Sequence, residues 1–152
     1  MRFFVLSCMA VLLLGCSNLS PSQLQAKRKL EKHAAEKAYP GGIYRQARLD
    51  GIDYRPVLKR AIDMDEAALI ELFGMSFIGE GGETHCENLW LLLRLWGDEH
   101  FGGVLAKQPK NISGRVVEMI THAWGHPDWN LYPKTYNASG WALYSEAAEV
   151  AR

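Results

Sequence analysis

One short stretch of the chain gathers residue types that could carry out chemistry. Its acidic and imidazole side chains fall within eight residues, around three glycines: Glu80, Glu83, His85 and Glu87. Carboxylates and an imidazole this close together could bind a divalent metal ion or act as a general acid and base. One hypothesis is therefore a small periplasmic metal-dependent hydrolase that uses Glu80, Glu83 and His85, with Glu83, His85 and His122 as candidate metal ligands.

The same stretch also has a purely structural interpretation. It contains no HExxH zinc signature and no EF-hand spacing, and no Lys-Ser/Thr pair follows its glycines as in a phosphate-binding loop. Acidic residues are favoured at the start of a helix, where the helix dipole attracts negative charge. This interpretation predicts no catalytic residue, no metal ion and no cofactor, and it makes Cys86 a packed core thiol.

A buried helix is the element that must position this cluster. From Thr84 the side chains Cys86, Leu89, Trp90, Leu93 and Trp96 repeat at the spacing of one helix face. Other leucines cover most of the remaining circumference, and a helix that is apolar nearly all round is surrounded by other elements. Thr84 and Glu87 have the spacing of a capping box, and Gly97 is placed to end the helix. The sequence therefore predicts a central helix over residues 84–97.

Helical character continues on both sides of this element. Apolar periodicity and capping residues predict further helices over about 57–62, 63–74, 98–109 and 111–123, with Asp63 and Asp98 as caps. A weak internal repeat with a period of 35 residues is typical of stacked helical hairpins. We therefore expect an all-α domain, either a small bundle or a solenoid-like stack of hairpins, with an irregular aromatic-rich C-terminal tail.

The start of the chain has the form of an export signal. A short basic start precedes the apolar run Phe3–Leu14, which is too short for a membrane span. The run ends in Leu13-Leu14-Gly15-Cys16, which resembles the lipobox of bacterial lipoproteins and covers nothing beyond these residues. The resemblance implies cleavage before Cys16, a diacylglyceryl group on its thiol, and acylation of the new amino terminus. Ser17 in place of Asp implies, in a Gram-negative host, the periplasmic face of the outer membrane.

These features predict four segments in the chain. They are a signal peptide at 1–15, a lipidated tether with a possible stalk helix at 16–43, a helical domain at 44–125 and an irregular tail at 126–152. Residues 26–39 have only a weak apolar stripe, which leaves open whether they dock on the domain. Because Cys8 lies in the signal peptide, Cys86 is the one thiol of the folded part, and we expect no disulfide partner.

Charge is unevenly distributed along the chain, although the formal net charge is zero. Residues 16–62 carry ten Lys/Arg against four Asp/Glu, and residues 63–99 carry nine acidic residues against one Arg. The basic block, next to the lipid anchor, could contact anionic head groups or form a solvated helix. Nucleic acid is not an expected partner of an exported protein without a basic excess. The acidic block favours a non-catalytic module that binds a protein of the cell envelope.

Two candidate binding surfaces follow from these patterns. The predicted protein-docking surface consists of exposed acidic residues: Asp65, Glu71, Glu80, Glu83 and Glu87. A further hypothesis is binding of peptidoglycan or another glycan, because tyrosine and tryptophan combine a large apolar ring with a polar tip. Its candidate residues are Trp129, Tyr132, Tyr136 and Trp141. The alternative is that these aromatic rings fill grooves between the helices.

Overall fold

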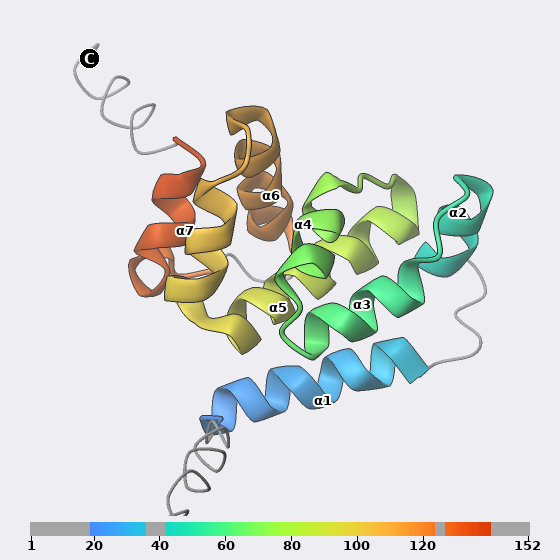
Figure 1. Ribbon diagram of the computed structural model, residues 1–152, viewed down its shortest axis with the longest axis horizontal. Helices are drawn as coiled ribbons and strands as arrows, with labels where there is room; N and C mark the ends of the chain where they lie inside the picture. Colours follow the sequence, from blue (N-terminus) through green and yellow to red (C-terminus); the bar gives the residue numbers. More distant parts are fainter. Residues whose placement is uncertain (1–18, 36–41, 124–126, 141–152) are drawn as a thin grey trace, which may run out of the picture.

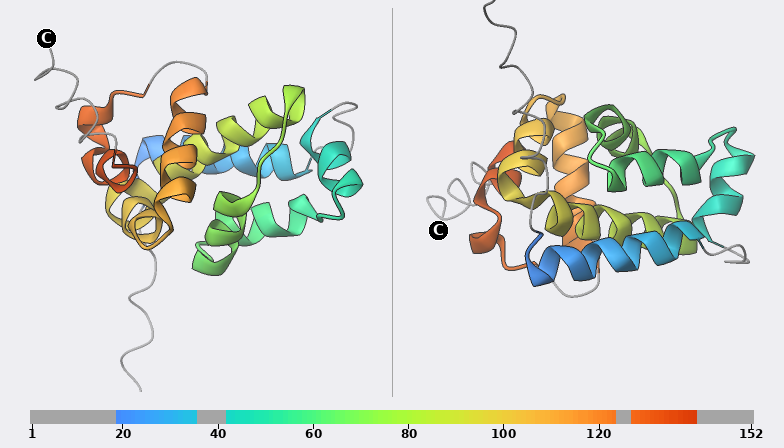
Figure 2. Two further views of the ribbon diagram at one scale, coloured as in Figure 1. Left: turned by 90° about the horizontal axis from the view of Figure 1, so that it is seen from above. Right: turned by 60° about the horizontal axis from the view of Figure 1, so that its bottom comes forward.

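The computed structural model describes residues 19–35, 42–123 and 127–140, and these residues form a small bundle of helices (Figures 1 and 2). The elements are α1 (Pro21–Ala35), α2 (Ile43–Leu49), α3 (Tyr54–Ile62), α4 (Glu66–Gly74), α5 (Gly79–Ala106), α6 (Lys110–His122), the 3-10 turn η1 (Trp129–Leu131) and α7 (Pro133–Ala138). The described ranges contain no β-strand. The prediction of an all-α small bundle is therefore confirmed.

Helix α5 is the centre of this bundle, and each of the other six helices contacts it. Its inward side chains Leu89, Leu92 and Leu93 are fully buried, as the leucine-rich sequence predicts. The helix begins at Gly79 rather than at Thr84, and the Thr84 hydroxyl donates to the Glu80 carbonyl within the helix (3.0 Å) instead of capping it. Although α5 has 28 residues, no helix in the described ranges is long and apolar enough to cross a membrane.

A sharp bend divides α5 at Gly97, whose φ of 75° and ψ of 160° lie outside the helical region. Figure 1 shows the second half of α5 turning towards α6 and α7. The expected end of the first half at Gly97 is thus correct. The expected cap at Asp98 is wrong, because its carboxylate accepts from the backbone N–H groups of Lys134 and Thr135 (2.8 Å each) at the start of α7. Asp98 therefore fixes α7 against the bend.

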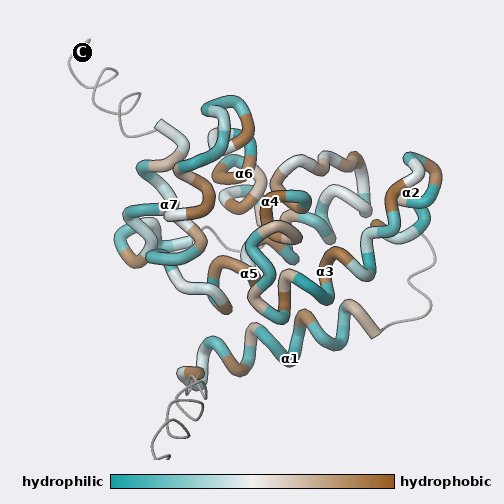
Figure 3. The backbone as a smooth tube through the Cα atoms, in the orientation of Figure 1, coloured by the Kyte–Doolittle hydropathy of each residue, from teal (hydrophilic) through white to brown (hydrophobic). Residues whose placement is uncertain are grey.

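Helix α1 is part of the bundle rather than a free stalk. Its residues Ala26, Leu30 and Ala34 are buried, and it runs along α5 in both views of Figure 2. Figure 3 shows that the rest of α1 is mostly hydrophilic, which is why its apolar stripe is weak in the sequence. The folded unit consequently includes α1, N-terminal to the expected start of the domain at residue 44.

The described part of the C-terminal tail is more regular than expected. Helix α7 packs on the second half of α5, where Gly102 lets the two backbones approach closely. A Cβ atom at Gly102 would lie 2.8 Å from the backbone nitrogen of Thr135. Tyr132 meets the half-buried Trp90 edge-on, with ring centroids 5.3 Å apart. The buried tryptophan of α5 is instead Trp96, whose indole N–H donates to the Ala61 carbonyl (2.9 Å).

The bend in α5 gives a prediction about stability. Replacing Gly97 by alanine should lower the free energy of unfolding by about 1–3 kcal/mol, because its φ and ψ values are accessible essentially only to glycine. Gly103 is the matched control, since it lies in the helix and a Cβ atom there would meet nothing within 4 Å. Gly103→Ala should raise the free energy of unfolding by roughly 0.5–1 kcal/mol. Urea denaturation of both variants measures the two changes. If both substitutions changed the free energy of unfolding in the same direction, the non-helical conformation of Gly97 would be contradicted.

Candidate functional site

The candidate residues of the stretch Glu80–Glu87 lie on different sides of helix α5. His85 is fully buried, whereas Glu80 and Glu83 are exposed. Because α5 already begins at Gly79, positions 83 and 85 diverge by about 200° around its axis. The predicted acid–base and metal cluster of Glu80, Glu83 and His85 is therefore not brought together.

The remaining candidates for chemistry lie apart as well. His122 is exposed at the end of α6, and no group of three His, Cys, Asp or Glu side chains in the described ranges could hold a metal ion. Cys86 is a free, half-buried thiol. Burial raises its pKa, and the nearby Glu83 carboxylate acts in the same direction. This environment disfavours the thiolate that a nucleophilic cysteine requires.

His85 instead belongs to a chain of polar side chains that crosses the interior. The Tyr54 hydroxyl lies 2.9 Å from His85 Nδ1, and Asn88 Nδ2 donates to the same hydroxyl (3.2 Å). Asn88 Oδ1 lies 2.8 Å from His33 Nδ1 on α1. This chain of polar side chains therefore connects the three helices α3, α5 and α1.

The hydrogen bonds of this chain assign the positions of its protons. Since the Asn88 amide nitrogen donates to Tyr54, its Oδ1 atom accepts from His33 Nδ1. The Tyr54 hydroxyl then donates its proton to His85 Nδ1, so the imidazole of His85 is neutral and carries its proton on Nε2. Sequence reasoning missed this role because it considered His85 only as a candidate metal ligand or acid–base group near Glu80 and Glu83.

Burial is the main cause that lowers the pKa of His85, to about 4. The carbonyl groups of Leu72 and Met75 oppose this effect, although neither makes a well-formed hydrogen bond with Nε2. Burial also raises the pKa of Tyr54 well above its usual range. Both groups are therefore uncharged at neutral pH, and the chain serves to hold three helices in register.

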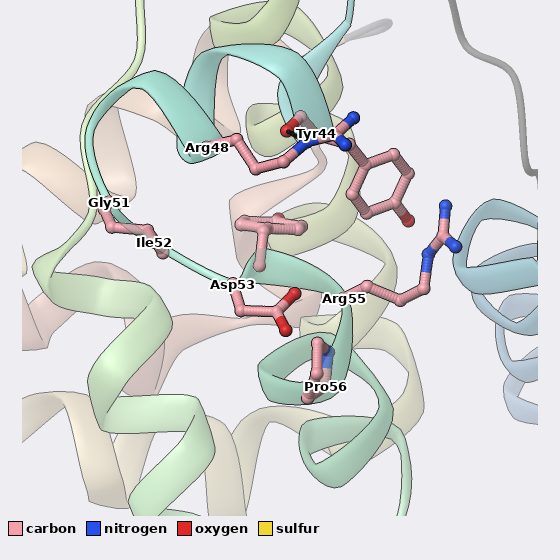
Figure 4. Close-up of a pocket in the computed structure, with 8 residues that line it drawn as sticks. Tyr44, Arg48, Gly51, Ile52, Asp53, Arg55 and Pro56 are labelled. Atoms are coloured by element: carbon pink, nitrogen blue, oxygen red, sulfur yellow. Dashed lines mark hydrogen bonds between the residues drawn. The ribbon is translucent and has the colours of Figure 1, made fainter.

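An open cleft of about 690 Å³ lies where α2 turns into α3, and Tyr54 is among the residues that line it (Figure 4). The Arg55 guanidinium lies over the Tyr44 ring, 4.5 Å from its centroid, and Arg48 Nε donates to the Tyr44 carbonyl (3.4 Å). Asp53 adds a carboxylate to the lining. Such a lining can bind a small polar group through charge and hydrogen bonds. The residues form no recognised motif, so the sequence did not reveal the cleft.

The predicted acidic docking surface is divided by ion pairs. Asp65, rather than the expected Asp63, caps α4 by accepting from the N–H groups of Ala67 and Ala68 (2.9 and 3.2 Å). The residues Asp65 and Glu71 also pair with Arg60, at 3.3 and 2.7 Å.

A third predicted acid, Glu87, is likewise paired within the fold. It contacts Lys29 of α1, and its carboxylate lies 4.0 Å from His33 Nε2. Within the part of the chain that the structure describes, Glu80 and Glu83 are the two predicted docking residues that form no ion pair. Of the predicted docking residues, the two without an ion pair therefore lie at the start of α5.

The aromatic side chains of the tail are used largely in packing. Trp129 and Tyr136 lie 5.5 Å apart, and both are partly buried against the core, as is Tyr132. Trp141, the fourth candidate for a glycan-binding surface, lies outside the described residues. The three described rings thus fit the groove-filling alternative better than an open recognition platform.

Comparison with protein-family models, with curated proteins and with solved structures gave no match. Function is therefore inferred from the geometry of the chain itself, and from the sequence at its N-terminus.

The neutral state of His85 gives a prediction about pH. Its folded pKa of about 4 lies below the usual histidine pKa of 6.5, so the unfolded chain binds more protons between these two values. The His85 contribution to the free energy of unfolding is complete above pH 6.5 and falls by roughly 3 kcal/mol as the pH decreases to about 4.

Chemical denaturation between pH 7 and pH 4 measures this loss. Because carboxylates add a slope of the same sign, the comparison is with His85→Gln, which should show a shallower pH dependence than the wild type. His122→Gln removes an exposed imidazole and should leave the slope unchanged. The interpretation fails if both variants follow the wild-type slope.

Proposed function

We propose that the protein is a lipoprotein of the bacterial envelope whose helical domain binds a protein partner without catalysing a reaction. Leu13–Cys16, which resemble a lipobox, support the anchor, and Ser17 supports the periplasmic face of the outer membrane as its location. Glu83 is exposed while His85 is buried, so the two cannot act together on a substrate, and the raised pKa of Cys86 disfavours its thiolate. These observations support a binding role over a hydrolytic one.

The observation that carries the binding role is the exposure of Ile78 beside unpaired acids. Ile78 is 82% exposed at the start of α5. Glu80 and Glu83 follow within five residues and are also exposed. We define Ile78, Glu80 and Glu83 as the α5-start surface. Such a combination fits a partner that has an apolar pocket with basic residues at its rim, because complementary rim charges guide association.

Photo-crosslinking in cells tests this surface. A photoreactive residue at Ile78 should capture one dominant envelope protein, identified by mass spectrometry. Leu131 is the matched control position, because it is apolar and 67% exposed on η1. The double variant Glu80→Lys/Glu83→Lys should weaken capture at Ile78, most strongly at low salt. No capture, or equal capture from both positions, would contradict the assignment.

Ile78→Ser separates binding from folding. Ile78 is the N-cap of α5 and makes no side-chain capping bond, and serine is a preferred N-cap residue. The variant should therefore keep the stability of the wild type while it loses binding to the captured partner. A variant that binds as the wild type does would remove Ile78 from the interface.

The anchor gives its own prediction. Cys16→Ala should transfer the protein from the membrane fraction to the soluble periplasmic fraction, because the thiol that would carry the lipid is lost. Intact-mass analysis of the wild type should show the added acyl chains. A wild-type protein without acyl chains, or a variant that stays in the membrane, would refute the lipid anchor.

A further inference from the structure

Two opposite charges line the cleft between α2 and α3 without neutralising each other. Arg48 lies in the last turn of α2 and Asp53 lies directly before α3, and both side chains are exposed. Figure 4 shows both among the residues that line the cleft. Within the described ranges neither of them forms an ion pair. Each charge is therefore available to a bound molecule.

Arg48 is suited to hold a carboxylate. Its Nε atom donates to the Tyr44 carbonyl (3.4 Å), which holds the guanidinium beside the cleft. Its two Nη groups make no hydrogen bond within the part of the chain that the structure describes. A guanidinium presents its N–H groups as a planar fork that matches the two oxygens of a carboxylate. We therefore expect an anionic carboxylate beside Arg48.

Asp53 is suited to hold an ammonium group, because the fold does not use its carboxylate. It is the N-cap residue of α3, where an aspartate usually accepts from the second or third N–H group of the helix. The third helical residue is Pro56, which has no N–H group, and Asp53 makes no side-chain capping bond. Its oxygens can therefore accept charge-assisted hydrogen bonds from a ligand.

The turn between the two helices fixes the backbone that carries these charges. Gly51 follows the end of α2 with a φ of 74°. Its N–H group donates to the Arg48 carbonyl (3.1 Å), and the Ile52 N–H group donates to the Ala47 carbonyl (2.7 Å). These two bonds form a Schellman motif, which closes the end of a helix. A backbone that is ordered in this way before a ligand arrives lowers the entropic cost of binding.

The rest of the lining leaves room for the apolar part of a ligand. Ile52 and the Tyr44 ring contribute apolar surface. The Arg55 guanidinium is already engaged above the Tyr44 ring, 4.5 Å from its centroid, so the ligand charges are assigned to Arg48 and Asp53. The volume of about 690 Å³ falls within the range of roughly 300–1,000 Å³ that is usual for sites of small molecules.

We propose that this cleft binds a small zwitterion, with its carboxylate on Arg48 and its ammonium group on Asp53. Free amino acids and dipeptides share this chemistry and differ in the distance between their two charges. Binding of such a ligand adds a second function to the domain. It depends neither on the α5-start surface nor on acylation of Cys16.

Isothermal titration calorimetry of the full-length protein in detergent tests the ligand class. The probes are leucine and leucyl-leucine, each compared with its N-acetylated form, which lacks the ammonium charge, and its amidated form, which lacks the carboxylate. One of the two zwitterions should saturate a single site, and the better of them identifies an amino acid or a dipeptide as the ligand. Each form with one charge should bind at least about tenfold more weakly, because a hydrogen bond to a charged group is lost. No binding of either zwitterion, or equal binding of a form with one charge, would overturn the proposal.

Variants then assign each charge of the ligand to its residue. Arg48→Gln should abolish the preference for the zwitterion over its amidated form, and Asp53→Asn should abolish the preference over its acetylated form. Arg45→Gln and Asp50→Asn are the matched controls, because both residues are exposed on or directly after α2 and lie outside the lining. The controls should keep both preferences. A variant of Arg48 or Asp53 that weakens all forms of the ligand equally would show a structural effect and overturn the assignment.

Discussion

The burial of α5 is the constraint on which the rest of the structure depends. Each fully buried leucine of its first half contributes roughly 1.5–3 kcal/mol relative to an exposed one. Complete burial also brings His85 and Asn88 into the interior, where an unpaired polar group costs about 1–3 kcal/mol. The hydroxyl of Tyr54 and the imidazole of His33 supply partners for these groups. The positions of α1 and α3 on α5 are therefore specified by hydrogen bonds as well as by apolar contact.

The opposite charge blocks of the sequence partly neutralise each other within the fold. Lys29 reaches Glu87 across 58 residues, and Arg60 pairs with Asp65 and Glu71 at 3.3 and 2.7 Å. Exposed ion pairs of this kind contribute little to stability. They do reduce the net field of the acidic block, because a paired carboxylate attracts a distant cation less strongly. An acidic stretch of sequence is for this reason a poor guide to an acidic surface.

Much of the fold could be predicted from the sequence. The leucine periodicity indicates the buried face of α5, and Gly97 indicates where the first half of α5 ends. The docking of α1 on the bundle was harder to predict, because its buried face has only one large apolar residue, Leu30, between Ala26 and Ala34. The start of α5 was misjudged because its three glycines and its acidic residues resemble a loop, although the structure begins the helix at Gly79. Because of that shift of five residues, Glu80 and Glu83 belong to the helix and are not in a loop that could bring them to His85. The site was mispredicted for this reason, and the Asp98 contact with α7 depended on residues 36 positions away.

The docking of α1 on the core connects the fold to the proposed function. A lipoprotein with a flexible stalk can sample a large volume above the membrane, because the end-to-end distance of a flexible chain grows with its length. Here the helix nearest to Cys16 is built into the core through Leu30 and the His33–Asn88 hydrogen bond. If Cys16 carries the anchor, the reach of the α5-start surface is set by the dimensions of the bundle and by the few residues before Pro21. The geometry then favours a partner that is itself held at the membrane, because a partner farther away would lie outside the volume that Ile78 can reach.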